Sequence, residues 1–468
     1  MTIKTILAAG AAAVVLSACG GGESDSVTDD KQAMEAANKP AEITVTQAEL
    51  AGNPFLEEWD TPFGIQPFSE IRDEHYMPAF KKGILELRAE IEAIANNPDE
   101  PTFENTILAM EKSGSLVTRV LYTFSSLTGT ELNENLRKIQ TELWPMWSRE
   151  SDAITLNKKL FERVVAVNEQ AAELDLNEED ARLLELTHRR FIRDGAALSQ
   201  DVKAQISDIN AELSEITTQF AQNLLAATKA FTIEISDEAE LAGLADDFKS
   251  NLWNEDKKAW VLGLNRSVYE TFMTQSENRD LRKKMFDGYR MRAADGEFNN
   301  GPLAIRVAQL RAKRAELMGY KSHAHYQLET RMAKTPQGAE DFLLQVWKPG
   351  LEQAKQDLAD MQAMVGDEFK FAGHDWWHYS EKLRKARFDL DENALKPYFD
   401  LKAVRQGAFT LANRLFGLTF TPVEMPVWND TVEAYEVRDD DGSHLGVFMA
   451  DMYARDSKRG GAWMNSYR

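Results

Sequence analysis

The sequence predicts a mainly α-helical protein with a small β-sheet near its C-terminal end. Helical periodicity runs from residue 66 to about residue 230. Strand-like alternation is confined to short stretches, the longest of which comes late in the chain. The chain has 468 residues, too many for one small hydrophobic core, so we expect more than one lobe.

The N-terminal stretch has the features of an export signal. Lys4 supplies a positive charge, and residues 6–16 form an apolar run too short to span a bilayer as a mature helix. Cys19, the single cysteine of the chain, follows Leu-Ser-Ala in a pattern that resembles the bacterial lipobox. We therefore expect a lipoprotein signal peptide over residues 1–18, a lipid on Cys19 and a membrane-anchored location on the periplasmic side. The alternative is a plain secretory signal with an incidental cysteine.

Residues 19–52 are rich in Gly, Ser, Asp, Ala and Lys, a composition typical of a flexible tether. Beyond it we expect an N-terminal helical lobe over residues 53–250 and a second lobe over residues 251–468. Except for the first stretch, no segment reaches 18 uninterrupted apolar residues, which indicates a soluble body.

The clearest helix lies within DVKAQISDINAELSEITTQFAQNLL. Its apolar residues recur at intervals of four and three and form one stripe: Val202, Ile206, Ile209, Leu213, Ile216 and Phe220. An intramolecular helical hairpin explains this stripe better than a coiled-coil partner. Two further helix starts are indicated by Asn177, which precedes three acidic residues, and by Thr335, which precedes a proline.

Strand signals are few. Residues 231–235 alternate with a period of two, and so, loosely, does the stretch EAYEVRDDDGSHLGVFMADMY. In the second stretch, Asp441 and Gly442 supply a turn between two β-rich arms, which predicts a hairpin.

Composition narrows the class of partner. The formal net charge is −22, and no basic stripe follows any predicted element. A nucleic-acid-binding protein needs such a stripe to neutralise phosphates, so we expect no nucleic-acid partner.

Residues 374–378 read HDWWH, which resembles the H-E-x-x-H helix of zinc peptidases. In a helix, His374, His378 and Glu381 would share a face and could hold a metal ion. However, Asp375 is one methylene shorter than the glutamate that serves as general base in such enzymes. The alternative is an aromatic-rich helix packed on a neighbour, with the histidines as half-buried polar tips.

Several phrases of the sequence, taken in order, resemble the thimet-oligopeptidase family of zinc metallopeptidases, and most closely its bacterial peptidyl-dipeptidase branch. The likeness covers roughly residues 53–468. Two positions depart from the family pattern: His325 stands where Asp is more frequent, and His374 replaces an aromatic residue. The phrases that carry the resemblance are WDTPFGIQPFSEIRDEHYMPAF (59–80), PTFENTILAMEKSG (101–114), NRDLRKKMFDGYRMRA (278–293), LRAKRAELMGYKSHAHYQLETRMAKTP (310–336), HDWWHYSEKLRKARFDLDENALKPYF (374–399) and LGVFMADMYARDSKRGGAWM (445–464).

The resemblance implies a two-lobed, neurolysin-like helical fold around a channel, one zinc ion, and release of C-terminal dipeptides from short peptides. It also implies that 374–378 is scaffold, because the family's H-E-F-G-H zinc helix follows the GGAWM phrase. The sequence stops at Arg468, before such a motif. We therefore expect an incomplete catalytic lobe, no catalytic residue and no metal ligand in this chain, and no activity of the chain alone. The alternative is an inactive helical periplasmic lipoprotein that binds peptides or a partner.

Within this chain, Gly460, Gly461, Ala462 and Trp463 are the candidate substrate-proximal residues. A strand here could pair with the backbone of a bound peptide, and glycines would permit close approach. The alternative is a turn that merely needs a positive φ. Three nearby cations, Arg455, Lys458 and Arg459, could meet a peptide carboxylate. Solvated surface charge is the more ordinary explanation for them.

Overall fold

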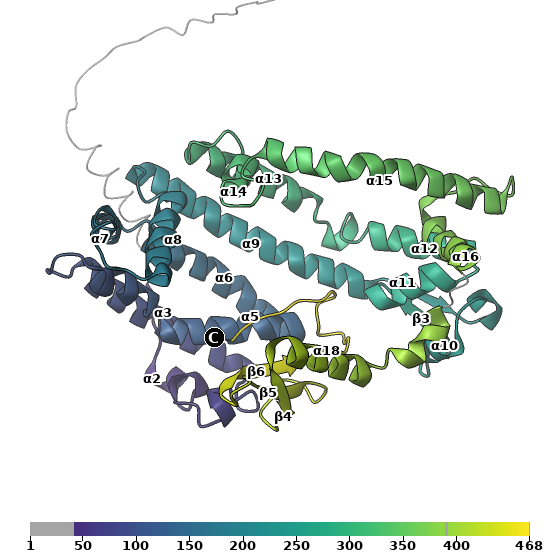
Figure 1. Cartoon of the computed structure of the whole chain (residues 1–468), viewed down its shortest axis with the longest axis horizontal. Coiled ribbons are helices and arrows are strands. Elements are labelled where there is room, and N and C mark those ends of the chain that lie inside the picture. Colours follow the sequence, from purple (N-terminus) through teal and green to yellow (C-terminus); the bar gives the residue numbers. More distant parts are fainter. Residues whose placement is uncertain (1–41, 389–391, 468) are drawn as a thin grey trace, which may run out of the picture. The chain divides into compact units, whose positions relative to one another are not determined.

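The computed structural model describes residues 42–388 and 392–467. These residues are mostly helical and include two three-stranded antiparallel sheets, which confirms the predicted fold class (Figure 1). None of the helices described there is both long enough and apolar enough to cross a membrane. The predicted signal peptide and Cys19 lie outside the described residues.

The described fold begins inside the stretch assigned to the tether. Helix α2 (Gln47–Leu50) starts at Thr46, whose side chain and that of Glu49 form a capping box. Ile43 and Leu50 are buried, and Ile43 belongs to the first hydrophobic core. Residues 42–52 are thus ordered by packing that their polar composition does not reveal.

The first core is built from helices between residues 73 and 194. Gly83 on α3 lies so close to α5 that a Cβ atom there would stand 2.7 Å from the backbone nitrogen of Val117. The predicted helix start at Asn177 is confirmed, since its side chain accepts a hydrogen bond from the backbone of Asp180. The helices are α3 (Asp73–Ala95), α4 (Ala109–Glu111), α5 (Ser115–Thr130), α6 (Glu134–Thr155), α7 (Lys158–Glu169) and α8 (Glu178–Asp194).

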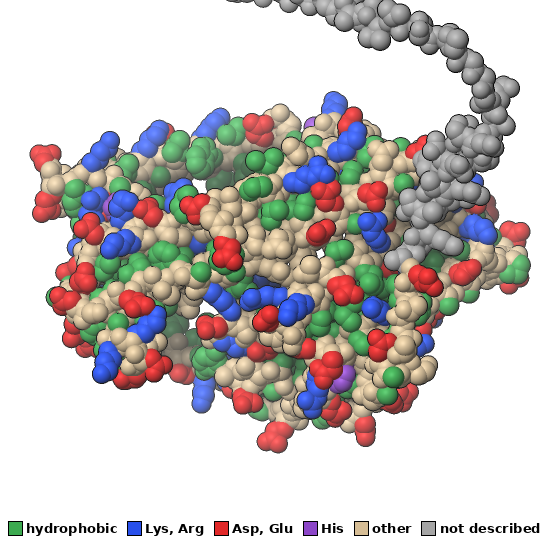
Figure 2. Space-filling view, turned by 180° about the vertical axis from the view of Figure 1, so that it is seen from behind, with side chains coloured by type: hydrophobic (Ala, Val, Ile, Leu, Met, Phe, Trp, Pro, Cys, Tyr) green, Lys and Arg blue, Asp and Glu red, His purple; other side chains and the backbone are tan. Residues whose placement is uncertain are grey.

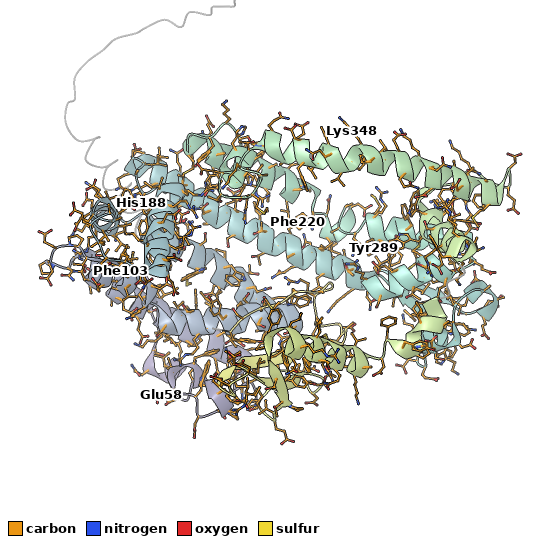
Figure 3. All side chains as sticks on the ribbon, in the orientation of Figure 1. Glu58, Phe103, His188, Phe220, Tyr289 and Lys348 are labelled. Carbon is orange, nitrogen blue, oxygen red and sulfur yellow. The ribbon has the colours of Figure 1, made fainter. Side chains whose placement is uncertain are left out.

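Helix α9 (Gln200–Ala230) carries the predicted apolar stripe. Ile206, Ile209 and Leu213 are buried, whereas the stripe becomes only half-buried toward Phe220, which is labelled in Figure 3. The helix packs against α6 on one side and α13 (Gly301–Leu317) on another. The intramolecular interpretation of the stripe is therefore confirmed.

A second core surrounds the first sheet. Its strands are β1 (Thr232–Ile235), β2 (Trp253–Asn254) and β3 (Ala259–Gly263), in the spatial order β1-β3-β2. The alternation predicted for residues 231–235 forms β1, which pairs antiparallel with β3. The sheet packs with α10 (Asp246–Leu252), α11 (Arg266–Gln275) and α12 (Arg279–Arg290).

Helix α15 (Pro336–Val365) begins at Thr335, as predicted, but most of its apolar side chains are exposed. Phe342 is 65% exposed and Trp347 is 62% exposed. Figure 3 shows side chains projecting along this helix around Lys348. Helix α18 (Leu401–Phe416) also has exposed apolar residues and no buried one. The remaining helices of this part are α14 (His323–Leu328), α16 (Trp376–Phe388) and α17 (Glu392–Leu395).

The second sheet contains the predicted hairpin. Its strands β4 (Thr419–Pro422), β5 (Glu433–Arg438) and β6 (His444–Ala450) are antiparallel neighbours in that order. Gly442 has a φ of 83° in the turn between β5 and β6, a conformation that glycine adopts without strain. Both sheets are small, and the one at residues 232–263 is additional to the single late sheet that the sequence predicts.

The surface mixes charge with apolar groups. On the face shown in Figure 2, acidic and basic side chains are interspersed among hydrophobic ones. Single exposed apolar residues are ordinary on protein surfaces, but the rows on α15 and α18 are longer than that.

Candidate functional site

The HDWWH stretch is a structural anchor. A 3₁₀ turn, η6 (Gly373–Asp375), leads into α16, so the two histidines do not share one continuous α-helix. Asp375 is fully buried and accepts hydrogen bonds from Arg279 Nε at 3.0 Å and Arg279 Nη2 at 2.9 Å. Arg282 Nη2 adds a third bond at 3.2 Å. A carboxylate held by two guanidinium groups in this way is a packing element, unlike a base that faces a metal-bound water.

In this stretch the histidines are buried and the tryptophans are exposed, which is the reverse of the expected packing. His374 and His378 are buried, whereas Trp376 is 36% and Trp377 is 43% exposed. The expectation of half-buried histidine tips on a buried aromatic face is therefore wrong. The physical reason is that α16 turns its histidine side toward α11, where His378 Nδ1 lies 3.1 Å from the carbonyl oxygen of Thr274.

These histidines do not form a metal site. Burial lowers the pKa of His378 to about 4, and burial also lowers the pKa of His374. Glu381 accepts two hydrogen bonds from Arg384, at 2.7 and 2.8 Å. Throughout residues 42–388 and 392–467, no group of three His, Cys, Asp or Glu residues could hold a metal ion. Because His378 and Glu381 have other partners and no third ligand lies near within the described residues, the stretch does not fit a zinc ion.

The candidate substrate-proximal residues belong to an irregular segment, residues 451–467, that follows β6 and lies along α5. The backbone N–H of Arg459 donates to the carbonyl oxygen of Gly129 at 2.8 Å. The hydroxyls of Ser126 and Tyr467 lie 2.7 Å apart. A Cβ atom at Gly129 would stand 3.7 Å from the ring of Trp463, so the indole lies against the helix. The segment is therefore positioned by a helix more than 300 residues earlier in the chain.

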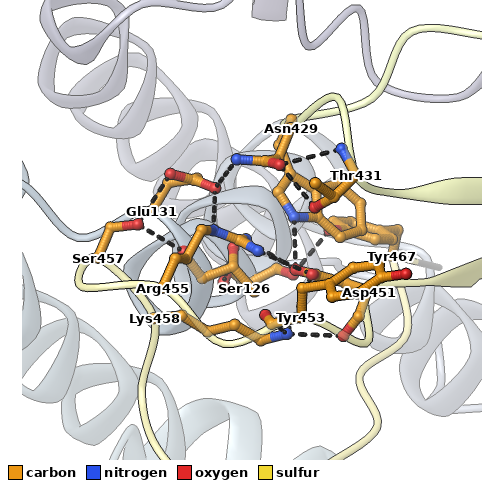
Figure 4. A network of polar contacts seen from close by, with 12 residues as sticks. Ser126, Glu131, Asn429, Thr431, Asp451, Tyr453, Arg455, Ser457, Lys458 and Tyr467 are labelled. Atoms are coloured by element: carbon orange, nitrogen blue, oxygen red, sulfur yellow. Dashed lines mark hydrogen bonds and ion pairs between the residues drawn. The ribbon is translucent and has the colours of Figure 1, made fainter. Parts of the chain in front are cut away.

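A network of half-buried charges fixes the start of this segment (Figure 4). Arg455 donates two hydrogen bonds of 2.8 Å to Asp451 and pairs with Glu131 at 2.6 Å. Lys458 Nζ lies 3.0 Å from Asp451, and Trp428 Nε1 donates to the same carboxylate at 3.0 Å. Neither interpretation offered for Arg455 and Lys458 holds: they are neither solvated surface charges nor free partners for a peptide carboxylate.

The sequence alone did not point to Asp451, Glu131 or Trp428. The only local signal was that the cations Arg455 and Lys458 follow Asp451 within seven residues. No such signal connects this group to Glu131, which is more than 300 residues away.

Gly460 and Gly461 lie beyond the anchor and are exposed. Gly461 has a φ of 99°, and a Cβ atom at either glycine would meet no atom within 4 Å. In the described part of the segment, no backbone N–H from Gly460 to Tyr467 donates a hydrogen bond. The positive φ suits a turn, and the open donors suit pairing with another backbone, so both interpretations of this segment remain.

Comparison with known proteins shows similarity to peptidases, both in the C-terminal part of the chain and along most of its length. Residues 272–468 match peptidase family M3. The chain is 37% identical over 427 residues to a dipeptidyl carboxypeptidase of Escherichia coli, an alignment that covers 89% of this chain and 63% of that protein. Residues 272–468 thus match a peptidase family. This match and the names of the relatives agree with the resemblance to the thimet-oligopeptidase family.

Two further relatives bear two different names. The chain is 34% identical over 429 residues to a dipeptidyl carboxypeptidase of Salmonella typhimurium, and 29% identical over 426 residues to an oligopeptidase A of the same organism. These alignments cover 89% and 88% of the chain, and 63% and 62% of the two relatives. The chain thus spans somewhat less than two thirds of the length of these relatives. The match to peptidase family M3, residues 272–468, contains the segment 451–467. Helix α5, to which this segment is bonded, lies outside that match.

The charge network around Asp451 should be sensitive to acid. Burial opposes ionisation of Asp451, but hydrogen bonds from Arg455, Lys458 and Trp428 lower its pKa from 3.8 to about 2. Because the folded pKa lies below the unfolded value, the stabilisation is complete above pH 3.8 and is lost as pH falls toward 2. In protein labelled with 5-fluorotryptophan, the ¹⁹F resonance of Trp428 should shift in this window. The shift should be absent in Asp451→Asn, and its persistence there would contradict the assignment.

Proposed function

We propose that this chain forms part of a zinc-dependent oligopeptidase that releases dipeptides from the C-termini of short peptides. Two relatives of more than 30% identity are named dipeptidyl carboxypeptidase, and residues 272–468 match a peptidase family. The described residues provide no zinc ligand set, so the proposal assigns no ligand and no hydrolytic step to them. We also propose that a lipid on Cys19 attaches the protein to a membrane on the periplasmic side. This part of the proposal rests on the lipobox-like pattern.

The observation that carries the proposal for this chain is the exposed, unpaired backbone after Gly460. An extended peptide can add to such donors as a strand does at a sheet edge, with main-chain hydrogen bonds providing affinity. The segment satisfies two requirements of this mode, because α5 and the charge network hold its position and its glycines leave open space beside it. We place the bound peptide beside Gly460, Gly461, Ala462 and Trp463.

One cation near this segment is available to a peptide carboxylate. Arg459 makes no ion pair within the described residues, and its guanidinium carbon lies 4.5 Å from the centre of the Trp463 ring. Arg455 and Lys458, in contrast, are paired with Asp451. Arg459 is therefore the member of the three that could meet the charged end of a peptide.

A proline substitution tests the backbone role, because proline removes the N–H donor. Ala462→Pro should weaken binding of a short peptide such as Ala-Ala-Phe about tenfold, the equivalent of roughly one hydrogen bond. Ala454→Pro is the matched control, since Ala454 is an exposed alanine of the same segment whose N–H makes no backbone hydrogen bond. Isothermal titration calorimetry measures both. An equal loss of peptide affinity in the two variants would contradict the proposal that the peptide binds beside Gly460–Trp463.

The second candidate function is peptide binding without hydrolysis by a helical lipoprotein. The absence of a zinc ligand set within residues 42–388 and 392–467 is the observation that favours it. The coding sequence beyond codon 468 distinguishes the two candidates. An H-E-x-x-H motif there supports the peptidase, and an immediate stop codon supports the binding protein. The 468-residue chain alone should bind peptides and leave them intact, so chelator-sensitive cleavage by it would contradict our assignment of no zinc ligand.

A further inference from the structure

A cavity of about 670 Å³ lies between α6, α9 and α13, away from the segment 451–467. Helix α6 contributes two indole rings, those of Trp144 and Trp147. Helix α13 contributes two guanidinium groups, those of Arg311 and Arg314. The wall formed by α9 is mostly hydroxyl and amide. A cavity that combines aromatic surfaces with a few convergent polar groups has the character of a small-molecule site.

One side of the cavity is a short chain of partly buried hydrogen bonds. Arg314 Nη1 donates to Asn210 at 2.7 Å, and Asn210 Nδ2 donates to Asp152 Oδ1 at 2.9 Å. Two atoms of this chain, Asp152 Oδ2 and Arg314 Nε, are buried and have no hydrogen-bond partner within the described residues. Because these two atoms are shielded from solvent, a ligand in the cavity would meet other groups of its wall.

The balance of charge in the cavity is positive. Burial raises the pKa of Asp152 to about 7, against the lowering effect of hydrogen bonds from Asn210 and Ser207. Arg311 is exposed and makes no ion pair or hydrogen bond within the described residues, whereas Arg314 is already bonded to Asn210. The cavity therefore presents one uncommitted cation, which favours a ligand with a carboxylate.

The two indoles determine the rest of the ligand. Trp144 and Trp147 are three residues apart on α6, so they project from one face of that helix, and both are only partly buried. Their rings offer a flat apolar surface on which an aromatic group can pack. We propose that this cavity binds small aromatic carboxylates, with Arg311 pairing with the carboxylate and the ring lying against Trp144 and Trp147. The carboxylate can come from a free aromatic acid or from the C-terminal residue of a short peptide.

Binding can be measured without any hydrolysis, so the proposal stands apart from the peptidase function. Tryptophan fluorescence of the 468-residue chain, excited at a wavelength that phenylalanine does not absorb, should change on titration with N-acetyl-L-phenylalanine. The matching amide, N-acetyl-L-phenylalaninamide, should bind at least about tenfold more weakly, because it lacks the charge that Arg311 recognises. Ala-Ala-Phe tests the peptide source. Binding of either acid supports the proposal and identifies the source.

Three variants locate the site. Arg311→Gln should weaken binding of N-acetyl-L-phenylalanine about tenfold, and Arg311→Lys should restore part of that loss. Arg331→Gln is the matched control, since Arg331 is also exposed and unpaired within the described residues but does not line the cavity. Because Arg311 makes no ion pair or hydrogen bond within the described residues, its replacement should leave the melting temperature nearly unchanged. Failure of both acids to bind, equal binding of acid and amide, or undiminished binding by Arg311→Gln would overturn the proposal. So would binding that Ala462→Pro abolishes, because that result would place the ligand at Gly460–Trp463.

Discussion

Replacing Asp375 with asparagine is expected to lower the free energy of unfolding by about 3–5 kcal/mol, the usual cost of breaking a buried ion pair. Asp375 is fully buried, and its partner Arg282 is 1% exposed. Replacing the carboxylate by an amide leaves the Arg282 charge buried with no opposite charge, and Arg279 keeps an acceptor for only one of its two bonds to this side chain. The loss should therefore be far larger than for a surface ion pair.

Urea unfolding of Asp375→Asn and of Asp280→Asn provides the test. Asp280 lies on the same α12 as both arginines, but it is exposed, so its replacement should change stability by less than about 0.5 kcal/mol. If the two variants unfolded at the same urea concentration, the anchoring role of the HDWWH stretch would be refuted.

Gly83→Ala should destabilise the protein by about 2 kcal/mol through overpacking. A Cβ atom there would stand 2.7 Å from the backbone nitrogen and 2.9 Å from the Cα of Val117, so α3 and α5 would have to move apart. Since α5 also holds the segment 451–467, the same change should loosen Trp463 from Gly129.

The matched control is Gly407→Ala on α18. A Cβ atom at Gly407 meets nothing within 4 Å, and alanine is the better helix former by about 1 kcal/mol. The two substitutions are chemically identical, yet their effects on the melting temperature should have opposite signs. A stabilised Gly83→Ala would show that the close approach of the two helices is not tight.

The features that the sequence predicted correctly are local ones. The starts of α8 and α15 follow from the capping residues Asn177 and Thr335, and the hairpin follows from the turn at Asp441–Gly442. Each depends on side chains and backbone within a few residues, so it can be predicted from the sequence alone. The apolar stripe on α9 can also be predicted, because it follows from the spacing of apolar residues in the sequence.

The features that the sequence missed depend on partners far apart in the chain. Asp375 is held by arginines more than 90 residues earlier, so the letters HDWWH gave no sign that the acid would be neutralised and buried. Arg455 meets Glu131 across more than 300 residues. The sequence shows which chemical group each side chain carries. It does not show that a distant partner already binds that group and so keeps it from a metal ion or a peptide.

The dependence of residues 451–467 on α5 has a consequence for the order of events during synthesis. The contact between Ser126 and Tyr467 spans 341 positions, so it cannot form until Tyr467 has emerged from the ribosome. Loop closure over such a separation is slow compared with helix formation, and the first core can assemble long before it. We expect the backbone after Gly460 to acquire its shape later than the first core, and to be a site where quality-control proteases act on newly made molecules.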